Sequence, residues 1–170
     1  MIMLKLKQIF ILKRILIYLV SLFFILFFVG GCSFRYMDWQ WYKFKKLLEN
    51  ESGLYIFEQE LHKEAMQRDM LSNGYGLIRE NDEHNFSSID SRIQEYRAFG
   101  KYFIDKNGDK HIISYARGFI YTDYGLWLHG DEGGGFHWDI ERELGGFLTK
   151  NNSYINTFYL KDNEWVKIGN

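Results

Sequence analysis

One apolar run near the amino terminus constrains this chain more than any other feature. Residues 15–29 read ILIYLVSLFFILFFV, interrupted only by Ser21. The residues before the run include four basic side chains and no acidic one: Lys5, Lys7, Lys13 and Arg14. A basic stretch followed by a short apolar run is typical of a secretory signal peptide. The run of residues 15–29 is shorter than the stretch of about 20 apolar residues that a helix needs to span the hydrocarbon core. The pattern therefore predicts an export signal over residues 1–31.

The residues that close the run make this prediction more specific. Val29 is followed by Gly30 and Gly31 and then by Cys32, the only cysteine of the chain. This stretch resembles the lipobox of bacterial lipoproteins, in which an aliphatic residue and two small residues precede an obligatory cysteine. The resemblance implies that the chain is cut before Cys32 and that its sulfur carries a diacyl, palmitate-type lipid. It extends over residues 1–33 only and implies nothing about the fold downstream.

Cysteine usage supports the same interpretation. Exported proteins normally hold their cysteines in pairs, as disulfides, whereas Cys32 has no possible partner in this chain. Two or three acyl chains on one residue meet the requirement that stable anchoring takes more than one lipid. In a cell with two membranes, Ser33 after the cysteine resembles proteins sorted to the outer membrane.

An uncleaved membrane helix with an incidental cysteine is the alternative. Charge does not decide its orientation, because basic residues lie after the apolar run as well as before it. Either way the sequence predicts a membrane-attached protein, placed in the cell membrane or the outer membrane. Its domain is expected to face the periplasm or the exterior.

The charge balance of the exported part excludes one class of partner. Residues 32–170 contain 17 basic and 22 acidic side chains, a formal net charge of −5. Nucleic-acid binding requires a basic surface, so no nucleic-acid partner is expected. The chain length allows one domain, which we place at residues 51–170.

Residues 32–50 connect the anchor to this domain and allow two interpretations. The sequence FRYMDWQWYKFKKLLEN over residues 34–50 mixes aromatic and basic side chains. One interpretation is an interfacial segment that lies against lipid headgroups, where tryptophan, tyrosine and lysine are favoured. The other is a tether that leads into a first helix.

The domain itself is predicted to be α+β, with one or two amino-terminal helices packed on an antiparallel sheet of about five to seven strands. Residues 58–72 have high helix propensity, and aromatic residues, which favour strands, make up 19% of the chain. Residues 89–96 fit a second short helix, and residues 92–99 fit a strand. From Lys101 onward, apolar runs alternate with polar turns, and Asn107-Gly108 predicts a tight hairpin.

Candidate site residues gather around a glycine-rich loop at residues 130–135. If the flanking strands form a hairpin centred on Gly133, His129 lies opposite His137 and Trp127 lies opposite Asp139. We predict that this loop is presented for partner binding. The candidate binding residues are Trp127, His129, Asp131, Glu132, His137 and Trp138. A metal site formed by His129, His137 and Asp139 is the alternative, since two imidazoles and a carboxylate suit zinc.

The sequence contains no recognisable catalytic motif. No serine occurs in a G-x-S-x-G setting, and the triple glycine lacks the lysine of a phosphate loop. We therefore expect a non-catalytic binding or structural lipoprotein of the cell envelope, with a protein partner and no cofactor. Assembly factors and immunity proteins belong to this class. A metal-dependent hydrolase that uses His129, His137 and Asp139 is the alternative function.

Overall fold

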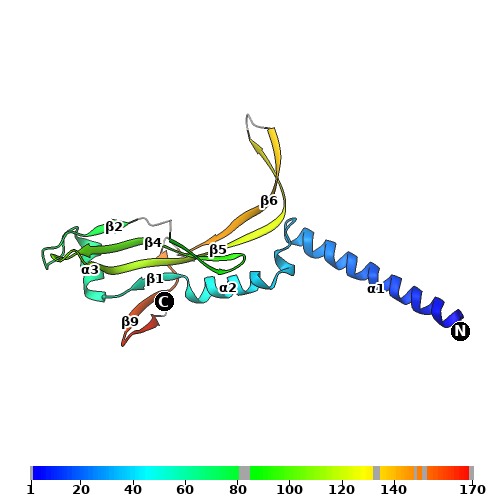
Figure 1. The fold of residues 1–170 in the computed structure, drawn as a ribbon, viewed down its shortest axis with the longest axis horizontal. Coiled ribbons are helices and arrows are strands. Elements are labelled where there is room, and N and C mark those ends of the chain that lie inside the picture. Colours follow the sequence, from blue (N-terminus) through cyan, green and yellow to red (C-terminus); the bar gives the residue numbers. More distant parts are fainter. Residues whose placement is uncertain (1, 81–84, 132–134, 148, 151–152, 169–170) are drawn as a thin grey trace. The chain divides into compact units, whose positions relative to one another are not determined.

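The fold is known from a computed structural model, which describes residues 2–80, 85–131, 135–147, 149–150 and 153–168 (Figure 1). The chain divides into two compact units. The first unit comprises residues 1–41 and 123–142, and the second comprises residues 42–122 and 143–170. We describe each unit by itself.

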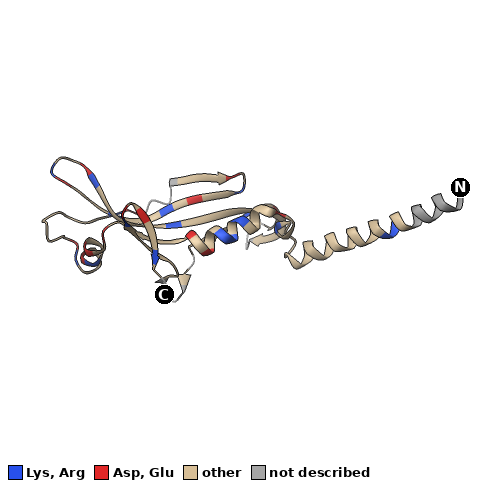
Figure 2. Cartoon of the chain, turned by 90° about the horizontal axis from the view of Figure 1, so that it is seen from below, with Lys and Arg blue, Asp and Glu red and all other residues tan. Residues whose placement is uncertain are grey.

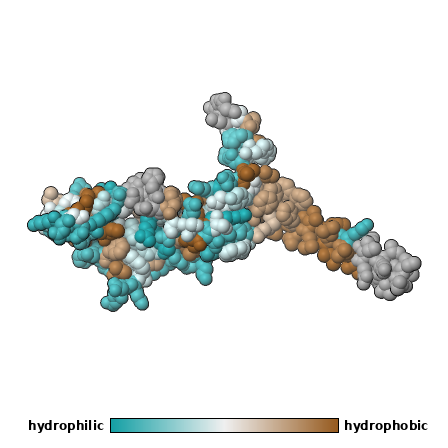
Figure 3. All heavy atoms as spheres, viewed as in Figure 1, coloured by the Kyte–Doolittle hydropathy of each residue, from teal (hydrophilic) through white to brown (hydrophobic). Residues whose placement is uncertain are grey.

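An apolar helix, α1 (Ile2–Val29), opens the first unit. Its segment Ile11–Val29 is long and apolar enough to cross a membrane, and none of that segment is buried. It carries no charged residue after Arg14, as the uninterrupted tan and brown colouring shows (Figures 2 and 3). A signal sequence has the same properties, so the structure is compatible with the predicted signal peptide and equally with a membrane helix.

The chain turns sharply where α1 ends. Gly31 and Cys32 both adopt left-handed backbone conformations, with φ angles of 71° and 60°. A short 3-10 helix, η1 (Arg35–Met37), follows. The ring of Phe34 packs 4.9 Å from that of Phe27 on α1, so the turn folds back against the helix end.

The second helix, α2 (Trp39–Glu51), begins where the Asp38 carboxylate accepts a hydrogen bond of 2.9 Å from the backbone N–H of Gln40. In the second unit, Phe44 is buried on this helix and lies 5.6 Å from the ring of Tyr121. The structure thus shows residues 34–50 leading into a helix, which is one of the two arrangements expected from the sequence.

A short strand, β1 (Gly53–Ile56), and a third helix, α3 (Gln59–Gln67), follow α2. Ala65 on α3 is fully buried in a cluster with Leu71, Phe103 and Ile113. The helix predicted over residues 58–72 ends at Gln67, and the chain beyond it turns to place Leu71 in this cluster.

The described residues form one sheet of eight strands and a separate two-stranded pair. The remaining strands of the large sheet are β2 (Ile78–Glu80), β3 (Asn85–Asp90), β4 (Ile93–Ile104), β5 (Lys110–Asp131), β6 (Gly135–Gly146), β9 (Thr157–Lys161) and β10 (Glu164–Ile168). The strand order is β10-β9-β1-β5-β4-β2, with β3 paired to β4 and β6 paired to β5. The small pair consists of β7 (Thr149–Lys150) and β8 (Ser153–Tyr154).

The predicted α+β class is confirmed, with two corrections to the sheet. It has eight described strands rather than five to seven. It is also mixed, because β1 pairs in parallel with β9 and antiparallel with β5. The first strand, β1, lies inside the sheet, and β9 is added beside it much later in the chain. No local sequence pattern predicts this parallel pairing, because consecutive strands usually pair with each other.

Two local predictions are decided by the structure. Residues 89–96 form no helix, since they lie in β3, a turn and β4, and the strand prediction for residues 92–99 is confirmed. The hairpin around Asn107-Gly108 is also confirmed, because Ile104 pairs with Lys110 and Gly108 has a φ of 90°.

Candidate functional site

The predicted hairpin residues lie on an arm of the first unit formed by the end of β5 and the start of β6 (Figure 1). The imidazole rings of His129 and His137 stack at 5.8 Å with an angle of 24° between their planes. Their Nε2 atoms lie 3.3 Å and 3.6 Å from the carboxylate oxygens of Asp139. The structure therefore brings together the three side chains that the assumed register placed on one face.

This cluster does not amount to a recognisable metal centre. Both histidines are more than half exposed, at 58% and 61% of their side-chain surface. Among the described residues, no group of three or more histidine, cysteine, aspartate or glutamate side chains is arranged to hold a metal ion. The side chain of Asp131 and the whole of Glu132 lie outside the described residues.

The two predicted tryptophans occupy different environments. Trp138 is 65% exposed. The Trp127 ring, in contrast, is half-buried and lies 4.2 Å from the guanidinium carbon of Arg142 in a cation–π contact. Trp127 thus belongs to the packing of the arm, and Trp138 to its surface.

A buried polar network, which the sequence did not reveal, fixes the base of the arm. Asp123 and Ser33 are fully buried, and the Ser33 hydroxyl donates a hydrogen bond to the Asp123 carboxylate. Nε and one terminal nitrogen of Arg142 each donate to Asp123 Oδ2 at 3.1 Å. A buried carboxylate is stable only when it is paired in this way. The network therefore ties the residue after Cys32 to both strands of the arm.

The second unit carries a concave aromatic surface that we call the aromatic hollow. Its volume is about 380 Å³, and eight residues line it: Glu51, Tyr55, Glu95, Arg97, Tyr115, Arg117, Phe158 and Trp165. The strand register explains the aromatic row, since Tyr55 on β1 pairs with Tyr115 on β5 and with Phe158 on β9. Residues that are paired across neighbouring strands lie on the same face, so these three rings emerge on one side of the sheet.

The rings of the aromatic hollow pack against one another. Tyr55 stacks on Tyr115 at 5.4 Å and on Phe158 at 4.5 Å, and Trp165 contacts Tyr55 edge-on at 4.8 Å. Burial raises the pKa of both tyrosines. The hydroxyls therefore stay protonated near neutral pH, and that of Tyr55 donates a hydrogen bond of 2.7 Å to the backbone carbonyl of Glu51.

Arg117 organises the charged side of the hollow. Its two terminal nitrogens donate to Glu51 at 3.0 Å and to Glu95 at 2.6 Å, and one of them also contacts the Tyr55 hydroxyl at 3.3 Å. Burial acts to lower the pKa of Arg117, but the bonds to Glu95 and Tyr55 outweigh it and raise the pKa above its usual range. The guanidinium is thus permanently charged and held in place beside the rings.

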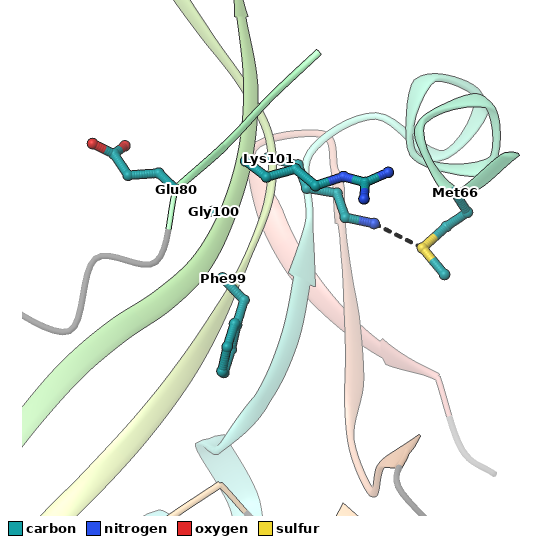
Figure 4. Close-up of a pocket in the computed structure, with 6 residues that line it drawn as sticks. Met66, Glu80, Phe99, Gly100 and Lys101 are labelled. Atoms are coloured by element: carbon teal, nitrogen blue, oxygen red, sulfur yellow. Dashed lines mark hydrogen bonds between the residues drawn. The ribbon is translucent and has the colours of Figure 1, made fainter. Parts of the chain in front are cut away.

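A second hollow, of about 360 Å³, lies between α3, β2 and β4 (Figure 4). Lys101 points across it, with its amine 2.7 Å from the sulfur of Met66. Burial, and next the charge of Arg79, lower the pKa of Lys101. Phe99 lies at the edge of this hollow, in a bulge of β4, with a φ of 54°. This hollow offers one amine, with no cysteine, serine or histidine among its described lining residues.

Comparison with known proteins identifies no relative. No protein-family model matches the chain, and no curated protein and no solved structure matches it.

Proposed function

We propose that this protein is a bacterial lipoprotein of the cell envelope, anchored through Cys32, whose domain works as a non-catalytic binding module for a protein partner. The observation that carries the membrane attachment is the position of Cys32. It lies three residues after the end of an exposed apolar helix, in the sequence Val29-Gly30-Gly31-Cys32.

The local geometry around Cys32 agrees with this proposal. Cys32 is a free cysteine and is partly exposed, which agrees with acylation of its sulfur. The two glycines before it present no side chains, which suits an enzyme that must approach the backbone closely. A peptidase cut before Cys32 would leave the new amino terminus joined to β5, through the bond of the Cys32 carbonyl to Leu126 and that of the Ser33 hydroxyl to Asp123.

The aromatic hollow is the proposed partner-binding site. Protein interfaces draw most of their binding energy from tryptophan, tyrosine and arginine side chains in partly desolvated positions. The hollow combines Trp165, two tyrosines and two arginines, and Trp165 remains 36% exposed. Its two carboxylates, Glu51 and Glu95, are both engaged by hydrogen bonds from Arg117. These features favour recognition over catalysis.

Metabolic labelling with palmitate tests the anchor. The wild-type chain should incorporate label and run as a shortened product, because acylation precedes cleavage. The Cys32→Ser variant should remain unlabelled at full length. Equal labelling of the two chains would contradict the lipoprotein assignment.

Photo-crosslinking in the producing cell tests the hollow. A photoreactive amino acid at position 165 should trap a discrete partner, and the same group at position 166 serves as the control. Trp165 and Val166 are neighbours on β10 with similar exposure, 36% and 46%, and successive residues of a strand point to opposite faces. Adducts of equal yield at both positions, or none at either, would rule out the hollow as the binding site.

One observation supports the alternative function, a metal-dependent hydrolase: the side chains of His129, His137 and Asp139 lie close together. Metal analysis of the purified protein distinguishes it from the binding module. Stoichiometric zinc that is lost in His137→Ala would favour the hydrolase, and the absence of bound metal from the wild type would exclude it.

A further inference from the structure

The arm of the first unit has one apolar face that is open to solvent. Leu126 and Leu128 on β5 are 48% and 54% exposed, and Phe136, Trp138 and Ile140 on β6 are 82%, 65% and 64% exposed. All five occupy alternate positions, so on each strand they share one side. We call this set the apolar face of the arm.

Contacts across the arm show that the two strands present this face on the same side. A Cβ built on Gly130, which is in phase with Leu126 and Leu128, would meet the ring of Phe136. The out-of-phase residues His129, His137 and Asp139 contact one another instead. The arm is therefore amphipathic, with an apolar side and a polar side that carries the histidines.

The base of the arm is joined directly to Cys32. Leu126 donates its backbone N–H to the carbonyl of Cys32 at 2.9 Å, and Phe34 donates to the carbonyl of Tyr124 at 2.9 Å, so Ser33 and Gly125 form a single antiparallel β-bridge. A side chain on Gly125 would overlap the Cys32 oxygen, so the close approach depends on glycine. The buried Ser33–Asp123–Arg142 network holds the same junction.

This junction fixes how far the apolar face can lie from the anchor. Adjacent paired strands are about 4.8 Å apart, and a strand advances about 3.3 Å per residue. Every residue from Leu126 to the end of β5 therefore lies within roughly 20 Å of Cys32. This limit holds whether Cys32 carries a lipid or simply follows a retained membrane helix.

We propose that the apolar face of the arm lies on the lipid surface and acts as a second membrane contact beside the anchor. The inference rests on the membrane attachment proposed above. Soluble monomers rarely expose a contiguous set of large apolar side chains, and aromatic residues such as Trp138 and Phe136 favour the interface between headgroups and hydrocarbon. None of the five residues is charged, so the contact requires no anionic lipid and is insensitive to salt.

Fluorescence quenching on vesicles tests this inference. The full chain is prepared with Cys32→Ser, which leaves α1 attached, and is reconstituted into neutral phosphatidylcholine vesicles. A single cysteine is introduced by Trp138→Cys on the apolar face, or by His137→Cys on the polar face as the matched control. Both side chains are largely exposed, at 65% and 61%, so neither change disturbs the core. Each cysteine carries an environment-sensitive fluorophore.

A lipid spin-labelled at the headgroup boundary should quench the fluorophore at position 138 several-fold more than that at position 137, at low and high salt alike. Equal, weak quenching on chains that still float with the vesicles would overturn the inference and leave membrane attachment intact. Chains that fail to float would show that α1 and the arm together do not hold the protein on the vesicle, which overturns the inference, whereas the lipid anchor on Cys32 is judged separately by the palmitate labelling. The fluorophore at position 138 could instead report a shielded environment that the spin label does not quench and that depends on protein concentration. That result would show that a second copy covers the face, which also overturns the inference.

Discussion

At the scale of single residues, buried polar side chains join segments that are far apart in the chain. Asn156 is 2% exposed, and its side-chain nitrogen donates to the carbonyls of Glu49 at 2.9 Å and Ser52 at 2.8 Å. These carbonyls lie in the last turn of α2 and directly after it, where helix geometry leaves acceptors without intrahelical partners. One asparagine thus closes the helix and attaches it to the strand that follows Asn156.

His62 provides a titratable contact of the same kind. Its Nδ1 lies 3.0 Å from the hydroxyl of Ser114, which is 1% exposed. Burial, and then the charge of Lys101, lower the pKa of His62 below its ordinary value of 6.5. The folded chain therefore binds a proton less readily than the unfolded chain.

We predict that the free energy of unfolding decreases as the pH falls below about 6.5, where the unfolded state gains a proton that the folded state resists. The contribution of His62 to the slope should stay below about 1.4 kcal/mol per pH unit, because only one proton is taken up. Urea titrations at about pH 7.5 and about pH 5.5 measure it. His62→Gln should flatten the slope. A slope that survives in His62→Gln would contradict the prediction.

Single residues also show why part of the site could not be predicted from the sequence. Asp123-Tyr124-Gly125 reads as a turn because aspartate and glycine are frequent in turns. The structure keeps all three within β5, since Ser33 and Arg142 neutralise Asp123 and Gly125 admits the Cys32 carbonyl. Those partners are distant in sequence, so no local pattern reports them.

At the scale of elements, β1 is the short strand on which the centre of the sheet depends. It has four residues and pairs on both sides, with β5 and with β9. Gly53 begins the strand at a point where a Cβ would overlap the backbone oxygen of Asn156. This contact leaves no room for a side chain.

We predict that Gly53→Ala lowers the free energy of unfolding by about 2–3 kcal/mol, because backbone must move to admit the methyl group. Gly76→Ala is the matched control, since a Cβ there meets nothing within 4 Å. It should change stability by no more than about 0.5 kcal/mol. Chemical denaturation of both variants makes the comparison, and equal losses would show that the β1–β9 junction is not tight.

Elements with strong local signals could be predicted from the sequence, and those defined by distant pairing could not. Asn107-Gly108 specifies its hairpin through backbone conformation. Strands β5 and β6 follow each other as expected, while the predicted turn at Gly133 lies outside the described residues. The aromatic hollow was missed, because Tyr55, Tyr115 and Phe158 meet only through the order of β1, β5 and β9. A high aromatic content was the one available signal, and it does not say which rings meet.

At the scale of the whole molecule, cleavage before Cys32 would change the charge of the protein. The full chain has a formal net charge of −1 and residues 32–170 have −5. We predict that the mature wild type focuses at a clearly lower isoelectric point than Cys32→Ser, whose full-length sequence value is near 6.5. Isoelectric focusing of membrane extracts compares them, and coincident bands would indicate that the basic amino-terminal segment is retained.

The parallel pairing of β1 with β9 has a consequence for how this chain acquires its structure. Leu54 and Thr157 are partners although about one hundred residues separate them. The centre of the sheet therefore stays incomplete until nearly the entire chain has been delivered. Proteins dominated by such long-range contacts fold slowly. A nascent chain of this kind remains open while it is being synthesised, which is the condition in which a polypeptide is threaded through an export channel.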